Sequence, residues 1–174
     1  MDFPILSLIL FLPALGAAVV ALWPSSRSVT IKRVAAFFTL VPFILAIYLA
    51  ANFSRAAGFQ FEENVSWISA LNASYHLGVD GINLPMVLLT VFIGFFAVLV
   101  SWKIELRVKE YFAWLLVLET GVLGVFLSLD LLLFFLFWEV ELIPMYMLIS
   151  IWGTGRKDYS AIKFVIYTVL GSAF

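Results

Sequence analysis

Residues 131–152 read LLLFFLFWEVELIPMYMLISIW, an almost wholly apolar run that carries two glutamates, Glu139 and Glu141. An α-helix needs about 20 apolar residues to cross the hydrocarbon core of a bilayer, so this run is long enough to span a membrane. A charged side chain at the bilayer centre costs about 2.5–3.5 kcal/mol on insertion scales, and the rare examples mark ion or proton pathways. The run therefore predicts a membrane-spanning helix that holds a candidate site for proton or ion transfer.

The composition of the whole chain agrees with this interpretation. The sequence is 64% hydrophobic and 12% charged, with a mean hydropathy of +1.12, whereas a soluble domain is about 45–50% apolar and about 25% charged. A net charge of −1 gives no support for a nucleic-acid partner. The chain has no cysteine and one histidine, which excludes disulfides, iron–sulfur clusters and His-rich metal or haem sites within it. Any redox centre must therefore lie in other subunits.

The apolar segments define the predicted spans. Five are long enough to cross a bilayer, and a sixth has begun where the sequence ends; they are residues 3–22, 34–51, 84–102, 111–129, 131–152 and 159–174. We therefore expect an all-α integral membrane protein, a polytopic helical bundle of five complete transmembrane helices and the start of a sixth. We also expect the sequence to be the N-terminal part of a longer protein.

The basic residues predict the orientation of these spans. They gather in the loops after the first, third and fifth spans: Arg27, Lys32, Arg33, Lys103, Arg107, Lys109, Arg156 and Lys157. In the loops on the other side, Arg55 is the single lysine or arginine. Because positively charged loops stay in the cytoplasm or its organellar equivalent, the N-terminus is predicted to be external.

The outer loop, residues 52–83, contains two stretches of strand character, 64–68 and 75–79. A short external hairpin is therefore predicted. Asn83 is predicted to cap the third helix, and Asp130 the fifth, by accepting hydrogen bonds from the first N–H groups of each helix.

Glu139 is the strongest candidate for a functional residue. It lies eight residues into its helix, about 12 Å along the axis, which is near the membrane midplane. It is predicted to take up and release a proton; the alternative is a structural glutamate bound to a neighbouring helix. Pro144 has no N–H, so the carbonyl of Val140 loses its helical partner and offers a place for buried water beside the carboxylate. The alternative for Pro144 is a helix kink that serves packing alone.

Three further ionisable residues lie within spans. Glu141 is about 200° around the helix from Glu139 and cannot share its site, so it faces another helix or lines a second polar cavity. Glu119, in the preceding antiparallel helix, is expected at a comparable depth, either on a proton path or in an interhelical hydrogen bond. Lys163 is expected either to extend to the cytoplasmic interface or to pair with a glutamate of the fifth span.

Several longer stretches resemble one known family. Residues 118–130, LETGVLGVFLSLD, resemble the fourth helix of chain M, also called subunit 4, of the proton-pumping NADH–quinone oxidoreductases, respiratory complex I. Residues 137–146, FWEVELIPMY, resemble its fifth helix, residues 77–86 the entry to its third, and residues 161–168 its sixth. The resemblance covers most of residues 75–174.

The resemblance implies a fold, a mechanism and partners. The full subunit would have fourteen helices with two inverted repeats, a plan that recurs in transporters, and residues 1–174 would be the N-terminal part of its proton-translocating, antiporter-like membrane domain. Glu139 would be the key glutamate, paired with a lysine of a later helix. The subunit would be part of an enzyme without holding a redox centre. NADH, FMN, iron–sulfur clusters and quinone would lie in or at other subunits, and the partners would be neighbouring antiporter-like subunits and the lipid bilayer.

Other assignments stay open at this level. A bacterial inner membrane is expected. The pattern of residues 138–144, with a glutamate at 141, resembles the photosynthetic NAD(P)H–plastoquinone counterparts, so a thylakoid or organellar inner membrane is the alternative. A subunit of an Mrp-type multisubunit sodium/proton antiporter is the alternative function. A membrane-bound hydrogenase subunit and a purely structural scaffold are further alternatives.

Overall fold

The structure, a computed structural model, describes residues 4–54, 58–68 and 73–172. Its elements are α1 (Ile5–Leu22), α2 (Ser28–Ala51), β1 (Gln60–Ile68), β2 (Ala73–Val79), α3 (Asn83–Val100), the short 3₁₀ turn η2 (Ser101–Lys103), α4 (Val108–Leu127), α5 (Leu131–Trp152) and α6 (Lys157–Ser172). Within the described ranges, five helices, α1 to α5, are long and apolar enough to cross a membrane. The predicted helical bundle is therefore confirmed.

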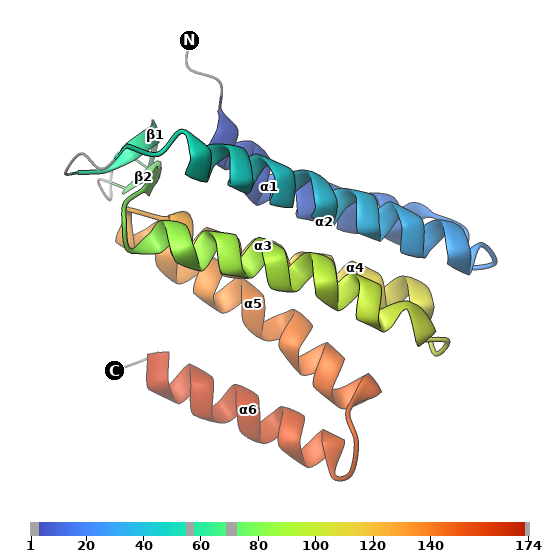
Figure 1. The fold of residues 1–174 in the computed structure, drawn as a ribbon. Helices are drawn as coiled ribbons and strands as arrows, with labels where there is room; N and C mark the ends of the chain where they lie inside the picture. Colours follow the sequence, from blue (N-terminus) through green and yellow to red (C-terminus); the bar gives the residue numbers. More distant parts are fainter. Residues whose placement is uncertain (1–3, 55–57, 69–72, 173–174) are drawn as a thin grey trace.

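Figure 1 shows the helices running side by side, with the hairpin at one end of the bundle and the α1–α2, α3–α4 and α5–α6 loops at the other. Helices α1 to α4 form the compact part, and α5 is tilted away from them so that α6 lies outermost and packs against α5. The basic residues of these three loops, which the sequence assigned to the inner side, therefore lie at the end of the bundle opposite the hairpin. Arg55, the exception on the other side, lies outside the described residues.

The largest differences between the helices and the predicted spans are at α2 and α4. Helix α2 begins at Ser28 rather than at residue 34. Lys32 and Arg33, which the prediction left in the preceding loop, therefore lie within its first turns. A charged residue ends an apolar stretch of sequence, but it does not end a helix, because the backbone hydrogen bonds continue past it. The predicted start of the first span at Phe3 and the end of the sixth at Phe174 lie outside the described residues.

Helix α4 ends at Leu127 rather than at Leu129 because the next residues pair with the hairpin. Ser128 forms an antiparallel bridge with Leu77, and the N–H of Leu129 donates to the carbonyl of His76 at 2.8 Å. The α4–α5 connection thus acts as a short third strand beside β2.

The hairpin is confirmed, and its strands are longer than the predicted stretches. Strands β1 and β2 pair antiparallel, with Asn64 opposite His76. Glu63 of β1 accepts hydrogen bonds from the N–H groups of Leu6 (2.8 Å) and Ser7 (3.1 Å) in the first turn of α1. A carboxylate at this position satisfies free backbone donors and complements the positive end of the helix dipole, so the hairpin caps α1.

Asp80 caps α3, and the prediction that Asn83 would do so is wrong. The Asp80 Oδ1 atom accepts hydrogen bonds from the N–H groups of Ile82 (2.8 Å) and Asn83 (2.7 Å). With these donors taken, the Asn83 amide instead donates to the carbonyls of Gly78 (3.0 Å) and Phe126 (3.1 Å). Asn83 therefore connects the hairpin to the end of α4.

Asp130 caps α5, as predicted. Its Oδ1 atom accepts from the N–H groups of Leu132 (2.9 Å) and Leu133 (3.1 Å), and its Oδ2 atom accepts from the N–H of Ser74 in β2 at 3.0 Å. The backbone donors of Ser74 and Leu133 hold the pKa of Asp130 below its ordinary value. One carboxylate thus fixes both the start of α5 and its attachment to the hairpin.

Lysines satisfy the opposite ends of the same three helices. Each donates to a backbone carbonyl at or just beyond a helix C-terminus, where carbonyls lack a helical partner and carry partial negative charge. The contacts are Lys109 Nζ to the Ala21 carbonyl of α1 (3.2 Å), Lys32 Nζ to the Trp102 carbonyl after α3 (2.7 Å) and Lys157 Nζ to the Ile151 carbonyl of α5 (2.9 Å).

Replacing Asp130 by alanine is expected to lower the thermal stability of the protein. Because the folded-state pKa is depressed, the stabilisation is complete above the ordinary aspartate pKa of about 4 and is lost as pH falls through the folded-state value. Asp130→Ala should therefore be less heat-resistant than the wild type at neutral pH, and the gap should close on acidification. Heat-induced aggregation of solubilised native membranes, followed by immunoblotting, measures this.

Asp158→Ala is the matched control, because Asp158 is an exposed aspartate in the first turn of α6. It should lower heat resistance less than Asp130→Ala does. An equal loss in both variants would contradict the role given to Asp130.

Candidate functional site: three intramembrane glutamates

Helices α4 and α5 approach closely at two glycines of α4. A Cβ placed on Gly121 would lie 3.0 Å from the Cβ of Glu141, and one on Gly124 would lie 2.1 Å from the ring of Phe137. These contacts fix the antiparallel register, in which Glu119 and Glu141 differ by about two residues in level, or about 3 Å along the axis. The predicted comparable depth of these glutamates is therefore confirmed.

Glu139 faces α6. Its side chain is half-buried, and its Oε1 atom accepts a hydrogen bond from the hydroxyl of Ser172 at 3.1 Å. The neighbouring indole of Trp138 is turned inward, and its buried Nε1 has no hydrogen-bond partner among the described residues. Glu139 thus lies at the α5–α6 contact, the outermost one in the bundle (Figure 1).

Glu141 lies on the other side of α5. Its Cβ and backbone pack against Gly121 of α4, and its side chain is half-buried. The expectation that Glu139 and Glu141 cannot share one site is confirmed, since the first contacts α6 and the second α4.

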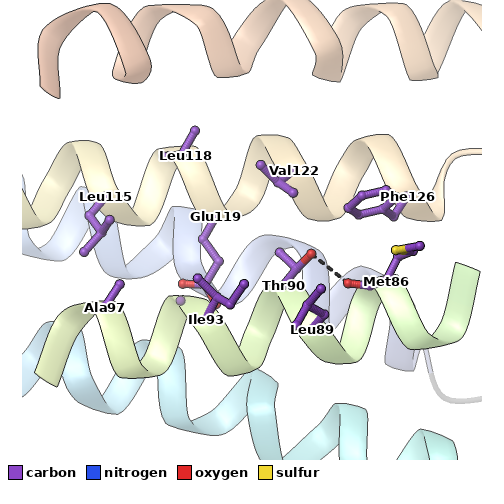
Figure 2. Close-up of a pocket in the computed structure, with 11 residues that line it drawn as sticks. Met86, Leu89, Thr90, Ile93, Ala97, Leu115, Leu118, Glu119, Val122 and Phe126 are labelled. Carbon is purple, nitrogen blue, oxygen red and sulfur yellow. Dashed lines mark hydrogen bonds between the residues drawn. The ribbon is translucent and has the colours of Figure 1, made fainter. Parts of the chain in front are cut away.

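Glu119 points away from both of them. Figure 2 shows its side chain extending from α4 toward α3, beside Ile93. A Cβ on Gly94 of α3 would lie 2.5 Å from its carboxyl carbon and 2.7 Å from each oxygen. The side chain is only 5% exposed, and neither oxygen has a hydrogen-bond partner in the described part of the chain. The three glutamates therefore share a depth without forming one cluster.

Lys163 does not pair with a glutamate of α5 in this structure. It is exposed on α6, and its Nζ lies 5.5 Å from the centre of the Tyr167 ring. The ion pairs found among the described residues are His76–Glu62 and Arg107–Glu110. Of the two predicted alternatives, the exposed position fits a side chain that extends to the interface.

Pro144 is buried within α5, which continues as a helix on both sides of it. The helix therefore tolerates the missing N–H without breaking, as membrane bundles commonly do. In the described residues, no group of three or more His, Cys, Asp or Glu side chains is placed to hold a metal ion.

Two site residues were not predicted from the sequence. Ser172 gives no local signal, because a serine near a helix end is common. Gly94 offers a weak one, since a glycine within an apolar helix often marks a close approach by another element. Neither contact follows from spacing along the chain, because each joins different helices.

Gly94→Ala is expected to destabilise the protein, because the new methyl group would overlap the Glu119 carboxyl. Overpacking of this kind costs about 1–3 kcal/mol, which offsets or exceeds the roughly 1 kcal/mol that alanine gains over glycine in a helix, so the variant should be less heat-resistant than one with alanine at an unhindered helix glycine. Gly171→Ala is the matched control, since nothing lies within 4 Å of a Cβ at that position of α6. Heat resistance in solubilised native membranes measures both variants.

The double variant Gly94→Ala/Glu119→Ala tests the cause of that loss. Removing the carboxyl should recover part of the stability lost in Gly94→Ala, as a double-mutant cycle detects for residues in contact. Strictly additive losses would contradict the contact.

Known proteins with similar sequences are subunits of quinone oxidoreductases. The family model described as NADH:quinone oxidoreductase/Mrp antiporter, TM, matches residues 128–174. NADH-quinone oxidoreductase subunit M of Rhodobacter capsulatus is 44% identical over 173 residues, which is 97% of this chain and 33% of that protein. The chloroplastic NAD(P)H-quinone oxidoreductase chain 4 of Chara vulgaris is 39% identical over 175 residues, 99% of this chain and 36% of that protein.

Solved structures show the same fold. The chain aligns with a chain of respiratory complex I from Thermus thermophilus with bound NADH, with a TM-score of 0.81 at 24% identity, covering 96% of this chain and 33% of that one. It also aligns with a chain of the membrane-bound sulfane sulfur reductase, an archaeal respiratory membrane complex, with a TM-score of 0.75 at 20% identity, covering 93% and 25%. The chain spans about a third of the length of the curated relatives it matches. Over nearly all its residues, the chain is similar in sequence to subunit M, or chain 4, of the NADH–quinone and NAD(P)H–quinone oxidoreductases.

Proposed function

We propose that this chain is part of a proton-translocating membrane subunit of an NADH– or NAD(P)H–quinone oxidoreductase, with Glu139 as its proton-transfer residue. The observation that supports this most directly is the half-buried carboxylate near the middle of α5, held by the Ser172 hydroxyl of α6. A carboxylate at that depth is costly unless it is used or paired. The similarity to subunits of quinone oxidoreductases also supports this proposal.

In this mechanism the chain contributes proton transfer and no electron transfer. Quinone reduction elsewhere in the complex changes the electrostatic surroundings of Glu139, which then loads a proton from one side and releases it to the other. The hydroxyl of Ser172 donates to the carboxylate and orients it. Because this bond crosses from α5 to α6, a shift between these helices alters the environment of the proton-carrying group.

The residues around Glu139 supply the rest of the path. Pro144 leaves the Val140 carbonyl without its helical donor one residue from Glu139, which favours a bound water there. Glu141 and Glu119 lie at a similar depth on other helix contacts, and we propose that they act through separate water-filled connections. Lys163 is proposed as the interfacial cation at the start of α6.

The proposed setting follows from the homologues. The chain is a multi-pass membrane protein, and we place it in a bacterial inner membrane, with a thylakoid or organellar inner membrane as the alternative. Its basic loops would face the cytoplasm or equivalent and its N-terminus the external side. NADH, FMN, iron–sulfur clusters and quinone would be bound in or at other subunits, and the direct partners would be neighbouring antiporter-like subunits.

A subunit of an Mrp-type antiporter is the second candidate, because the matching family model covers both classes. Ion transport that continues without an electron donor or a quinone would favour the antiporter. Transport that stops when either is withdrawn would favour the oxidoreductase.

Glu139→Gln is expected to abolish or strongly reduce proton pumping while the complex still assembles, because glutamine keeps the shape and the hydrogen bond but cannot release a proton. Proton-to-electron stoichiometry in native membrane vesicles, with assembly checked on native gels, measures this. Glu141→Gln is the matched control on the opposite side of the same helix and should reduce pumping less. Wild-type stoichiometry in an assembled Glu139→Gln complex would overturn the assignment.

A further inference from the structure

The carboxyl group of Glu119 is enclosed between α3 and α4. Both of its oxygens are buried, and neither has a hydrogen-bond partner among the described residues. The hydroxyls of Thr90 and Thr120 donate instead to carbonyls of their own helices, at 2.8 Å and 3.0 Å. The adjoining groove between the same helices is almost wholly apolar (Figure 2), and apolar cavities stay dry. Neither water nor a protein donor therefore solvates this carboxyl group in the described part of the chain.

No cation among the described residues faces Glu119 from the helices packed around it. Helix α4 packs against α1, α2, α3 and α5, and neither α1 nor α3 contains a charged residue. An ionised carboxylate without a counter-charge or a hydrogen bond is far more costly to bury than the neutral acid. The ionisable residues of the other packed helices lie elsewhere: Lys32, Arg33, Lys109, Glu110 and Tyr111 toward the basic end of the bundle, Tyr48 toward the hairpin end of α2, and Glu139, Glu141 and Tyr146 on α5.

The backbone of α3 covers the carboxyl group. A Cβ on Gly94 would lie 2.5 Å from the carboxyl carbon of Glu119 and 2.7 Å from each oxygen, so one Cα hydrogen of this glycine is directed at the carboxyl group. A Cα–H···O contact is weak, so it covers the oxygens without compensating a charge on them. Separation of α3 from α4 at this level would uncover both oxygens together.

Two hydrogen bonds join α3 and its terminal turn to α4, and both lie at the ends of the contact. At the hairpin end, the Asn83 amide donates to the Phe126 carbonyl at 3.1 Å. At the basic end, the hydroxyls of Ser101 and Tyr111 are hydrogen-bonded at 2.8 Å. Glu119 lies seven residues from Phe126 and eight from Tyr111 along α4, which is midway between the two bonds. Between them, within the described ranges, packing alone keeps the carboxyl group covered.

We propose that Glu119 holds its proton while Gly94 covers it, and that it exchanges this proton with water only when α3 and α4 separate at this level. The water-filled connection proposed above for Glu119 is then closed in this structure, and the α3–α4 contact is its gate. The use of this gate in proton transfer rests on the proposed function. The closed, protonated state does not, because it follows from burial and the missing counter-charge.

Labelling with dicyclohexylcarbodiimide in native membranes that contain the intact complex tests the proposal. This lipid-soluble reagent reacts with protonated carboxyl groups, and mass spectrometry locates the N-acylurea adduct. Modification of Glu119 should be slow in the wild type. Tyr111→Phe removes the hydroxyl bound to the turn after α3 but keeps the ring and its contacts with Phe112 and Trp152, so it should raise the rate several-fold. Tyr159→Phe, at an exposed tyrosine of α6, is the matched control and should leave the rate unchanged.

Gly94→Ala provides a second way to open the contact. Its methyl group would hold α3 away from the carboxyl group, so Glu119 should be modified faster than in the wild type. Assembly of each variant is checked on native gels, and Tyr111→Phe serves alone if Gly94→Ala fails to assemble.

Three outcomes would overturn the proposal. They are modification of Glu119 that is as fast in the wild type as in Tyr111→Phe, no modification of Glu119 in any assembled variant, and an equal rise in Tyr159→Phe. Wild-type pumping in Glu139→Gln would overturn the proposed function instead, and it would leave these labelling rates unaffected.

Discussion

Hydrocarbon offers no hydrogen bonds, and this constraint orders the whole chain. The backbone meets it by forming helices, which leaves unpaired N–H and carbonyl groups at their ends. The ends of α1, α3 and α5 are satisfied in the same way: carboxylates of Glu63, Asp80 and Asp130 accept from their N-termini, and lysines donate at or near their C-termini. Carboxylates at the N-terminus and lysines at the C-terminus also complement the dipole of each helix.

The same charges therefore serve two purposes. Three of the eight basic residues that make the predicted inner side positive, Lys32, Lys109 and Lys157, also donate to helix ends, so orientation and local stability depend in part on the same side chains. The hairpin supplies Glu63 directly and holds Asp80 and Asp130 beside it, through Asn83 and the Ser74 N–H. An outer hairpin with no membrane span of its own thus organises three spanning helices.

Much of this was predictable because it is local or periodic. The five spans, the hairpin and the Asp130 cap follow from runs of apolar residues and from residue types next to helix starts. Asn83 was misassigned because Asp80, three residues earlier, competes for the same N–H groups. The Glu63 cap, the Ser172–Glu139 bond and the Gly94–Glu119 contact were not predictable, since each joins segments whose relative rotation depends on packing. The sequence predicts the depth of each glutamate in the membrane, but it does not predict which helix each glutamate faces.

The glycines of α4 have a mechanical consequence. Where Gly121 and Gly124 let α5 come within contact of the α4 backbone, neither helix can turn about its axis without driving the Phe137 ring or the Glu141 Cβ into the other. The two helices are therefore expected to move together as one unit. The Glu139 carboxylate lies on the face of α5 that meets α6, so a displacement of the α4–α5 pair relative to α6 changes its distance from the Ser172 hydroxyl.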